Sequence, residues 1–147
     1  MATRSTIALE FADGSVGQVY CHWDGYLDHN GKLLLKNYMD PFKLQKLIDL
    51  GDLSSLGPEI GVKHEFGEVC QDCTFYGRDR GETGIEARYF KDFADYVANH
   101  QYEEFEYILR QVNGKAVWFV ADHDNHYMEL EQAIADEQDR IAQEETV

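Results

Sequence analysis

Apolar side chains recur at every second position near the start of the chain and at helical spacing farther along it. Residues 6–11 have the period of two that is typical of a half-buried β-strand. Asp13 and Gly14 follow and predict a hairpin turn, because glycine readily adopts the positive φ that a tight turn requires. Residues 16–23 then return as a second strand, so the pattern predicts that the chain opens with a β-hairpin.

The parity of this second strand separates its side chains into two sets. Cys21 and Trp23 share one face with Val19, whereas Tyr20 and His22 share the other. If the first set faces the core, we expect Tyr20 and His22 to point outward or into a cleft.

Helical patterns follow the hairpin. The leucines within residues 33–38 indicate a short helix. The aspartate–proline pair at 40–41 predicts the start of a second helix, with aspartate as N-cap and proline at the first helical position, and Gly51 predicts its end. Residues 52–58 are interpreted as a compact turn and residues 59–72 as a loop.

The second half of the chain repeats this mixture, with a strong hairpin signal at Asn113 and Gly114. The predicted elements are strands at 73–78, 105–109 and 117–121, and helices at 89–97 and from about Asn125. Two hairpins and one further strand predict an α+β domain over residues 1–147. Its mostly antiparallel sheet of about five strands would carry helices on one face and end in an acidic helix.

The charge of the chain restricts its partners. Its formal net charge is −15, with 28 acidic against 13 basic residues, which argues against direct, sequence-blind binding of nucleic acid. The acidic surface predicted on the C-terminal helix consists of Glu129, Glu131, Asp136, Glu137 and Asp139. We expect it to attract a basic partner, the alternative being an acidic surface that only keeps the protein soluble.

One candidate site lies where two predicted strands end. Its members are Tyr20, His22, Asp24, Tyr76, Arg78, Asp79, Arg80 and Glu82. If these strands are neighbours, the arginines offer a planar fork for phosphate or carboxylate, the histidine moves a proton near neutral pH, and the tyrosines form a flat wall. The alternative is a structural one, in which the arginines and acids form ion pairs that pin a loop and His22 caps Asp24.

The three cysteines are an odd number and suit a reducing cytosol better than a disulfide framework. Cys70 and Cys73 have the spacing of half a zinc site, with His64 upstream and Cys21 as a further donor. A second pair of ligands is missing from the sequence, and Cys73 falls on the apolar face of its predicted strand. We therefore expect no cofactor, with zinc at Cys70 and Cys73 as the minor alternative.

Residues 122–126 gather aspartate, histidine and asparagine side chains that are donors to divalent cations. A turn that leads into a helix N-terminus explains the same residues, because acids are favoured there by the helix dipole. We prefer the turn.

Several familiar signatures are missing from the sequence. It has no P-loop, dinucleotide-binding glycine motif, nucleophile elbow or HExxH zinc motif, so nothing specific argues for an enzyme. It has no apolar run of membrane-spanning length, and residues 1–20 lack a basic start followed by an apolar stretch. We expect a protein that does not bind membranes and remains in the compartment where it is made.

Four segments resemble a family of small, uncharacterised bacteriophage and prophage proteins. They are TRSTIA at 3–8, YCHWDGY at 20–26, GDLSSL at 51–56 and YGRDRGE at 76–82. The similarity extends from about residue 3 to residue 82 and weakens afterwards. It implies no activity, cofactor or catalytic residue, but it implies a phage protein acting in the cytoplasm of a bacterial host.

Charge, size and this resemblance together predict an accessory protein that binds and modulates a host macromolecule. A basic host protein that itself binds nucleic acid, in defence or transcription, is the expected partner. The first alternative is a protein that binds or hydrolyses a nucleotide or small phosphate ligand with His22, Asp24, Arg78 and Glu82. The second is a structural homo-oligomer.

Overall fold

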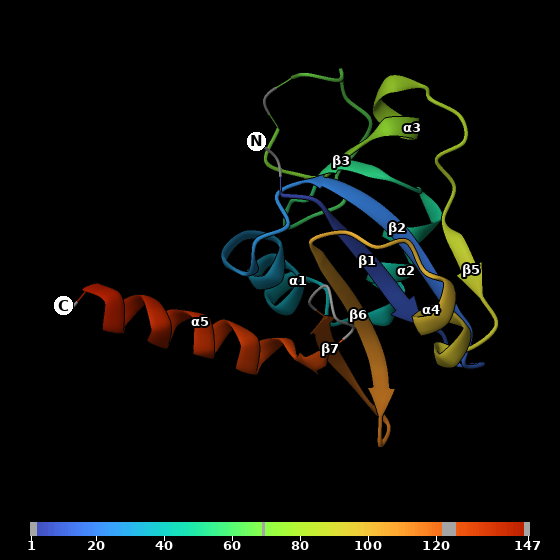
Figure 1. Cartoon of the computed structure of the whole chain (residues 1–147). Helices are drawn as coiled ribbons and strands as arrows, with labels where there is room; N and C mark the ends of the chain where they lie inside the picture. Colours follow the sequence, from blue (N-terminus) through green and yellow to red (C-terminus); the bar gives the residue numbers. More distant parts are fainter. Residues whose placement is uncertain (1–2, 69, 122–125, 146–147) are drawn as a thin grey trace.

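The computed structural model describes residues 3–68, 70–121 and 126–145, and its centre is one open sheet of eight strands (Figure 1). The strands are β1 (Ser5–Glu10), β2 (Val16–Trp23), β3 (Leu53–Ser55), β4 (Thr74–Phe75), β5 (Arg88–Phe90), β6 (Phe105–Val112), β7 (Lys115–Ala121) and β8 (Tyr127–Glu129). Their order is β4-β3-β2-β1-β6-β7-β8, and β5 pairs with the first half of β2.

Five α-helices and one π-helical turn connect or follow these strands in the described part of the chain. They are η1 (Leu27–Gly31), α1 (Lys32–Asn37), α2 (Pro41–Asp49), α3 (Tyr76–Arg80), α4 (Phe93–Asn99) and α5 (Leu130–Glu145). Among the described residues, no helix has the length and apolar character needed to cross a membrane.

The sheet is larger than predicted and partly parallel. The pairs β1–β2 and β6–β7 are antiparallel hairpins, as expected, but β1 runs parallel to β6 and β2 runs parallel to β3. Five of the seven pairings among the described strands are antiparallel, so the sheet is mostly antiparallel as predicted. The predicted number of about five strands was too low, because β3, β5 and β8 have only three residues each. Strands this short have too few residues to produce a recognisable alternation of apolar and polar positions in the sequence.

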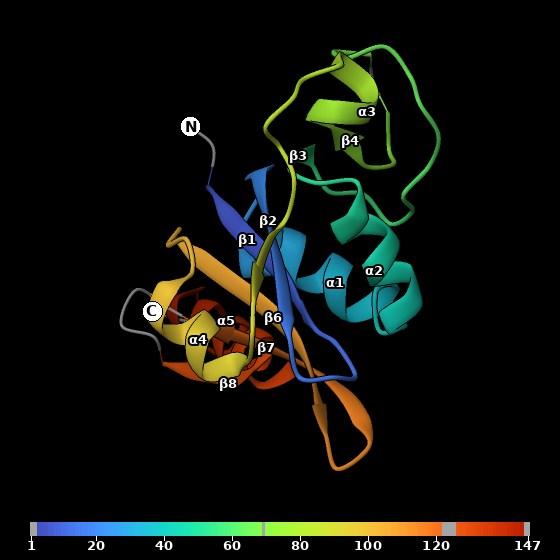
Figure 2. The same cartoon turned by 90° about the vertical axis from the view of Figure 1, so that its right-hand side faces the viewer.

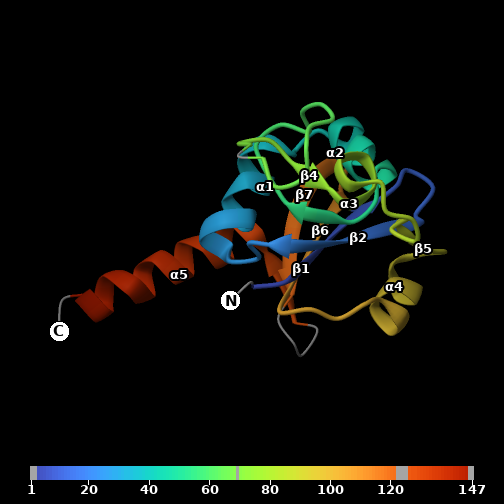
Figure 3. The ribbon, with the colours of Figure 1, turned by 90° about the horizontal axis from the view of Figure 1, so that it is seen from above.

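Helices lie on both faces of the sheet, which corrects the prediction of helices on one face. Ile7 and Leu9 belong to the larger core under α1, α2 and the start of α5. Ala8 and Ile108 point to the opposite face and pack with Tyr96 of α4. Figure 3 shows α1 and α2 on one side of β1 and β2 and α4 on the other, and Figure 2 shows β3, β4 and α3 together at one end of the molecule.

The strongest local signals in the sequence are confirmed. The side chain of Asp40 accepts a hydrogen bond from the backbone N–H of Phe42 at 2.9 Å, and α2 begins at Pro41. Asn113 and Gly114 both have positive φ values, 52° and 79°, as the two-residue turn between β6 and β7 requires. These elements form where predicted because their caps and turns depend on adjacent residues only.

The parity of β2 is confirmed for most of its length. Val19 and Cys21 are buried, whereas Tyr20 and His22 are partly exposed on the other face. Trp23 departs from this prediction, because 43% of its surface is exposed. It is the last residue of β2, where the chain leaves the sheet and little of the core remains to cover it.

Several predicted elements are replaced by shorter ones. The strand expected at 73–78 ends at Phe75 and continues as α3, and the turn expected at 52–58 contains β3. The helix expected at 89–97 is split into β5 and α4, where Asp92 caps the helix by accepting from the N–H of Asp95. The C-terminal helix begins after β8, and residues 122–125 of the candidate cation site lie outside the described residues.

We predict that Gly51→Ala destabilises the protein by about 3 kcal/mol. Gly51 follows α2 with a φ of +86°, and a Cβ atom there would overlap the backbone oxygen of Ile85. Chemical unfolding followed by circular dichroism measures the loss.

Gly84→Ala is the matched control for this prediction. Gly84 also has a positive φ, +75°, but no atom lies within 4 Å of the position of an added Cβ. We expect this variant to lose only about 1 kcal/mol, the cost of the backbone conformation. Equal losses in the two variants would contradict the steric explanation.

Candidate functional site

The segment that follows β2 is held in place by the amide of Asn30, which is fully buried. Its Nδ2 donates to Ser5 Oγ at 3.2 Å and to Cys21 Sγ at 3.5 Å. Its Oδ1 accepts from the backbone N–H of Asp24 at 3.3 Å and lies 2.9 Å from His29 Nδ1. One side chain thus joins β1, β2 and the turn η1.

Two further contacts fix the path of the chain at Gly25. Tyr107, on β6, donates its hydroxyl to the backbone oxygen of Gly25 at 2.6 Å, and the N–H of Gly25 donates to the oxygen of Thr3. The carboxylate of Asp24 accepts from the N–H of Thr3 at 3.3 Å. The motif at 20–26 therefore has a structural role as well as exposed side chains.

Tyr20 and His22 interact with each other on the face of β2 opposite the larger core. The hydroxyl of Tyr20 lies 2.6 Å from Nδ1 of His22, and the His22 ring meets the Trp23 ring edge-on at 5.3 Å. Burial raises the pKa of Tyr20 to about 12, so this hydroxyl stays protonated at neutral pH. Among the described contacts His22 does not cap Asp24, which corrects that structural alternative.

Arg78 forms hydrogen bonds to the backbone of the preceding loop. Its Nη1 donates to the oxygens of Ile60 and Gly61 at 2.9 and 3.1 Å, and its Nη2 donates to the oxygen of Cys73 at 2.9 Å. Its Nε donates to Asp79 Oδ1 at 3.0 Å. These contacts match the alternative in which the arginine–carboxylate cluster pins a loop.

Asp79 completes this cluster with a carboxylate that has no exposed surface. It accepts from the backbone N–H groups of Phe75 at 2.8 Å and His64 at 3.1 Å as well as from Arg78. Burial by itself would raise the pKa of Asp79, but the hydrogen bonds from Arg78 and the two amides hold the pKa below its ordinary value. The ionised carboxylate therefore stabilises the native loop.

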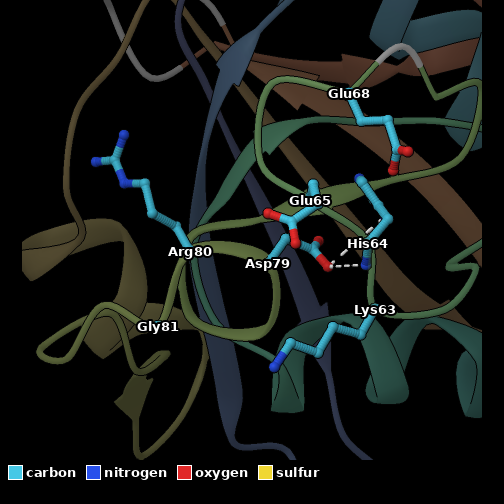
Figure 4. Close-up of a pocket in the computed structure, with 7 residues that line it drawn as sticks. All are labelled: Lys63, His64, Glu65, Glu68, Asp79, Arg80 and Gly81. Atoms are coloured by element: carbon cyan, nitrogen blue, oxygen red, sulfur yellow. Dashed lines mark hydrogen bonds and ion pairs between the residues drawn. The ribbon is translucent and has the colours of Figure 1, made fainter.

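Arg80 lies beside an open cavity of about 660 Å³ (Figure 4). Its guanidinium stacks over the rings of Phe66 and Tyr76 at 4.5 and 5.3 Å and pairs with Glu82 at 2.7 Å. Figure 4 shows Arg80 extending away from His64 and Asp79, which are in direct contact with each other. The residues that line the cavity are Lys63, His64, Glu65, Glu68, Asp79, Arg80 and Gly81.

The predicted edge site thus falls into two groups, which approach each other at Asp52: its carboxylate accepts from the N–H of Tyr20 at 2.8 Å and its backbone oxygen from the N–H of Tyr76 at 3.3 Å. Tyr20, His22 and Asp24 lie at or just after the end of β2, whereas the residues from Tyr76 to Glu82 form α3 and the two positions after it. Between β2 and β4 lies β3, which the sequence did not predict. Among the described residues, no hydrogen bond or ion pair connects His22 or Asp24 with the arginines or acids at 78–82.

The cysteines have different environments. Cys73 is buried, with Sγ 3.3 Å from the hydroxyl of Tyr38 and 3.3 Å from the backbone nitrogen of Gly57, and burial raises its pKa. Cys70 is exposed, and Cys21 is buried beside Asn30. In the part of the chain that is described, no three histidine, cysteine or acidic side chains are grouped to hold a metal ion.

Two cavities adjoin the segment from Trp23 to His29. One, of about 390 Å³, is lined by Asp24, Tyr26, Leu27, Asp28, His29, Phe105 and Glu137. The other, of about 600 Å³, is lined by Trp23, Asp24, His29, Leu33, Ser55, Leu56, Gly57, Pro58, Cys70, Gln71 and Asp72. The sequence analysis identified Asp24 and Glu137 but not His29 or Asp72, which no motif distinguishes.

A buried histidine–glutamate pair was also not predicted from the sequence. His100 and Glu106 both have no exposed side-chain surface, and their Nδ1 and Oε1 atoms lie 3.4 Å apart. The ring of His100 stacks on Tyr96 at 4.6 Å, and Glu106 Oε1 accepts from the N–H of Glu103. The pair lies next to α4, on the face of the sheet for which no helix was predicted.

The acidic helix α5 extends away from the rest of the molecule (Figures 1 and 3). Leu130 and Ala133 in its first turn are buried, whereas 39% of Ile141 is exposed. Arg140, the one basic residue of α5, pairs with Glu137 at 3.1 Å and Glu144 at 2.7 Å. The exposed acids of the predicted surface are Glu129, Glu131, Asp136 and Asp139, and Glu137 is partly buried.

Comparison of the chain with protein-family models, curated proteins and solved structures finds no match.

We predict that Asp79→Asn lowers the stability at neutral pH by about 3 kcal/mol, because Arg78 and two amides lose a buried anionic acceptor. The pKa of Asp79 lies below the ordinary 3.8, so its contribution is present above that pH and is lost as the pH falls through the lower folded-state value. Thermal unfolding over the acidic range should show the variant and the wild-type protein converging below that value.

Asp136→Asn is the control, since Asp136 is exposed on α5. We expect it to follow the wild-type pH dependence closely. A constant difference between Asp79→Asn and the wild-type protein from neutral to strongly acidic pH would contradict the role of the ionised carboxylate.

Proposed function

We propose that this protein is a non-catalytic accessory protein that binds a basic macromolecular partner through the acidic helix α5. The observation that carries this proposal is the position of α5, which extends from the body with most of its acidic side chains exposed (Figure 1). A helix held to its own chain only near one end has most of its surface available for a partner.

The charge of α5 favours a cationic partner. The helix has six acidic residues against one arginine, and that arginine already pairs with two of the acids. The net charge of −15 for the whole chain repels nucleic acid at long range and accelerates encounter with a basic surface. A basic protein, such as one that itself binds nucleic acid, therefore suits this surface best.

The resemblance of the motifs at 20–26 and 76–82 to small bacteriophage proteins supports a bacterial host protein as the partner. On this proposal the protein acts in the host cytoplasm and modulates the partner by occupying its basic surface.

The nucleotide or phosphate site on His22, Asp24, Arg78 and Glu82 has less support. The guanidinium of Arg78 already donates hydrogen bonds to three backbone oxygens and to Asp79, and Glu82 pairs with Arg80. A phosphate at Arg78 would have to displace hydrogen bonds that hold the loop before α3.

The proposal is tested with an α5 variant, Asp136→Asn with Asp139→Asn and Glu144→Gln, as bait in bacterial lysate. We expect the wild-type chain to retain a dominant basic protein at low salt and release it at high salt. With that protein purified, the variant should bind about tenfold more weakly or worse, because exposed charges mainly steer association and each contributes little.

The matched control is Glu65→Gln with Glu68→Gln and Glu86→Gln, three exposed acids outside α5 whose removal changes the net charge equally. It should bind nearly as well as the wild-type chain. If both variants weakened partner binding equally, or if the affinity did not depend on salt concentration, a specific role for the charge of α5 would be contradicted. Retention of only untagged copies of the same chain would favour the structural homo-oligomer instead.

A further inference from the structure

The larger cavity beside Trp23 combines an exposed aromatic ring with carboxylates. Its volume is about 600 Å³, and it lies between the end of β2 and the segment at 70–72. Trp23 is 43% exposed, whereas Trp118, the other tryptophan, is 1% exposed. Asp24 and Asp72 line the same cavity. A large indole left accessible beside two carboxylates is unusual on a surface whose other tryptophan is in the core.

Among the residues that the structure describes, the carboxylates of this cavity share its lining with one imidazole, that of His29, but with no permanently charged base. No lysine or arginine lines the cavity among the described residues. Asp24 and Asp72 form no ion pair within the described residues, whereas Asp52 pairs with Arg88 at 3.2 Å. The two carboxylates therefore present uncompensated charge to any group that enters the cavity.

Apolar side chains complete the wall. Leu33, Leu56 and Pro58 line the cavity together with Trp23. A side chain that enters must combine a cationic, planar head with an apolar stem to satisfy both parts of the lining.

Arginine has this chemistry. Its guanidinium stacks on an indole face and donates paired hydrogen bonds to carboxylates, and its methylene groups pack on aliphatic surface. We infer that this cavity binds an arginine side chain presented by the basic partner. The inference rests on the proposed function for the identity of the partner, but it concerns residues outside α5.

The neighbouring cavity connects this arginine site with α5. The two cavities share Asp24 and His29, and the smaller one is also lined by Tyr26 and by Glu137 of α5. A partner segment anchored by its arginine at Trp23 would therefore continue past Tyr26 toward the acidic helix.

Other cavities of the described structure fit a cationic side chain less well. The cavity in Figure 4 contains Lys63 and Arg80. The cavity beside α2 contains Lys43 and Lys46. Bases in the lining would repel an entering guanidinium, so charge disfavours these two cavities. The smaller cavity at Tyr26 also has no lysine or arginine among its described lining residues, but the indole of Trp23 lines only the larger of these two neighbouring cavities.

The test uses the full chain and a short capped peptide with one arginine between glycine and serine residues. Its twin contains citrulline, which keeps the shape but removes the charge. Two readouts report on the cavity directly. Trp23 is the exposed tryptophan, so its fluorescence should change on binding, and Cys70, the exposed cysteine among the three, lines the cavity and should be protected from alkylation.

We expect saturable binding of the arginine peptide at roughly millimolar concentration, as for a single anchoring side chain. The citrulline peptide should bind about tenfold more weakly or worse, because the charge-assisted hydrogen bonds are lost. Equal binding of the two peptides, or no protection of Cys70 at saturation of the fluorescence change, would overturn the inference.

Two substitutions locate the site. Asp72→Asn should weaken the arginine peptide about fivefold or more, and Trp23→Leu should abolish protection of Cys70. Glu68→Gln, a nearby exposed acid that does not line this cavity, should leave binding unchanged. The near-ultraviolet signal of buried Trp118 verifies that each variant is folded, and Trp23→Phe should retain part of the protection because it restores an aromatic face.

The α5 variant separates this inference from the proposed function. It should bind the arginine peptide within about twofold of the wild-type chain, since its three substituted acids lie outside the cavity. If the peptide fails to bind while α5 still determines capture of the partner, only the arginine site is wrong. If the peptide binds as expected while the α5 variant captures the partner normally, the proposed function of α5 is wrong.

Discussion

The buried amide of Asn30 is the interaction on which the two proposed binding surfaces of this protein depend. The chain must leave the sheet at Trp23 and reverse over the start of β1, and Asn30 supplies the bonds that this reversal requires. If these hydrogen bonds were broken, the buried amide and its partners would remain desolvated and unpaired, which costs free energy. The hydrogen bonds therefore favour this arrangement of the turn. The turn η1 packs against α5, and a Cβ atom added to its last residue, Gly31, would lie 3.4 Å from Leu130, so the same turn supports the start of α5.

The two proposed binding surfaces therefore share one support. Trp23, Asp24 and His29 are placed at the cavities by the turn that Asn30 organises, and α5, which follows β8 in the chain, packs against the same turn. Some other charged groups of the fold are neutralised locally, as with Arg78 and Asp79 or Arg88 and Asp52. On the proposed function, the carboxylates at Trp23 and along α5 are the part of the negative charge that recognises the partner.

The sequence predicted the features that adjacent residues determine. The cap at Asp40, the turn at Asn113, the parity of β2 up to Cys21 and the acidity of α5 needed no knowledge of the fold. It did not predict β3, β5 or β8, because strands of three residues depend on their neighbours in the sheet. Asp72 joins Trp23 only through the folding of the loop before α3, so the cavity between them carries no sequence signature.

The most direct test of a basic partner on this face is a titration of the isotope-labelled protein with an arginine–serine repeat peptide, followed by amide NMR. We expect perturbations at residues 23–29, 55–58 and 70–72 and along α5, which decrease together as salt is added. Perturbations centred instead on the surface around Lys43 and Lys46, or an unchanged spectrum at low salt, would contradict recognition of a basic partner by this face.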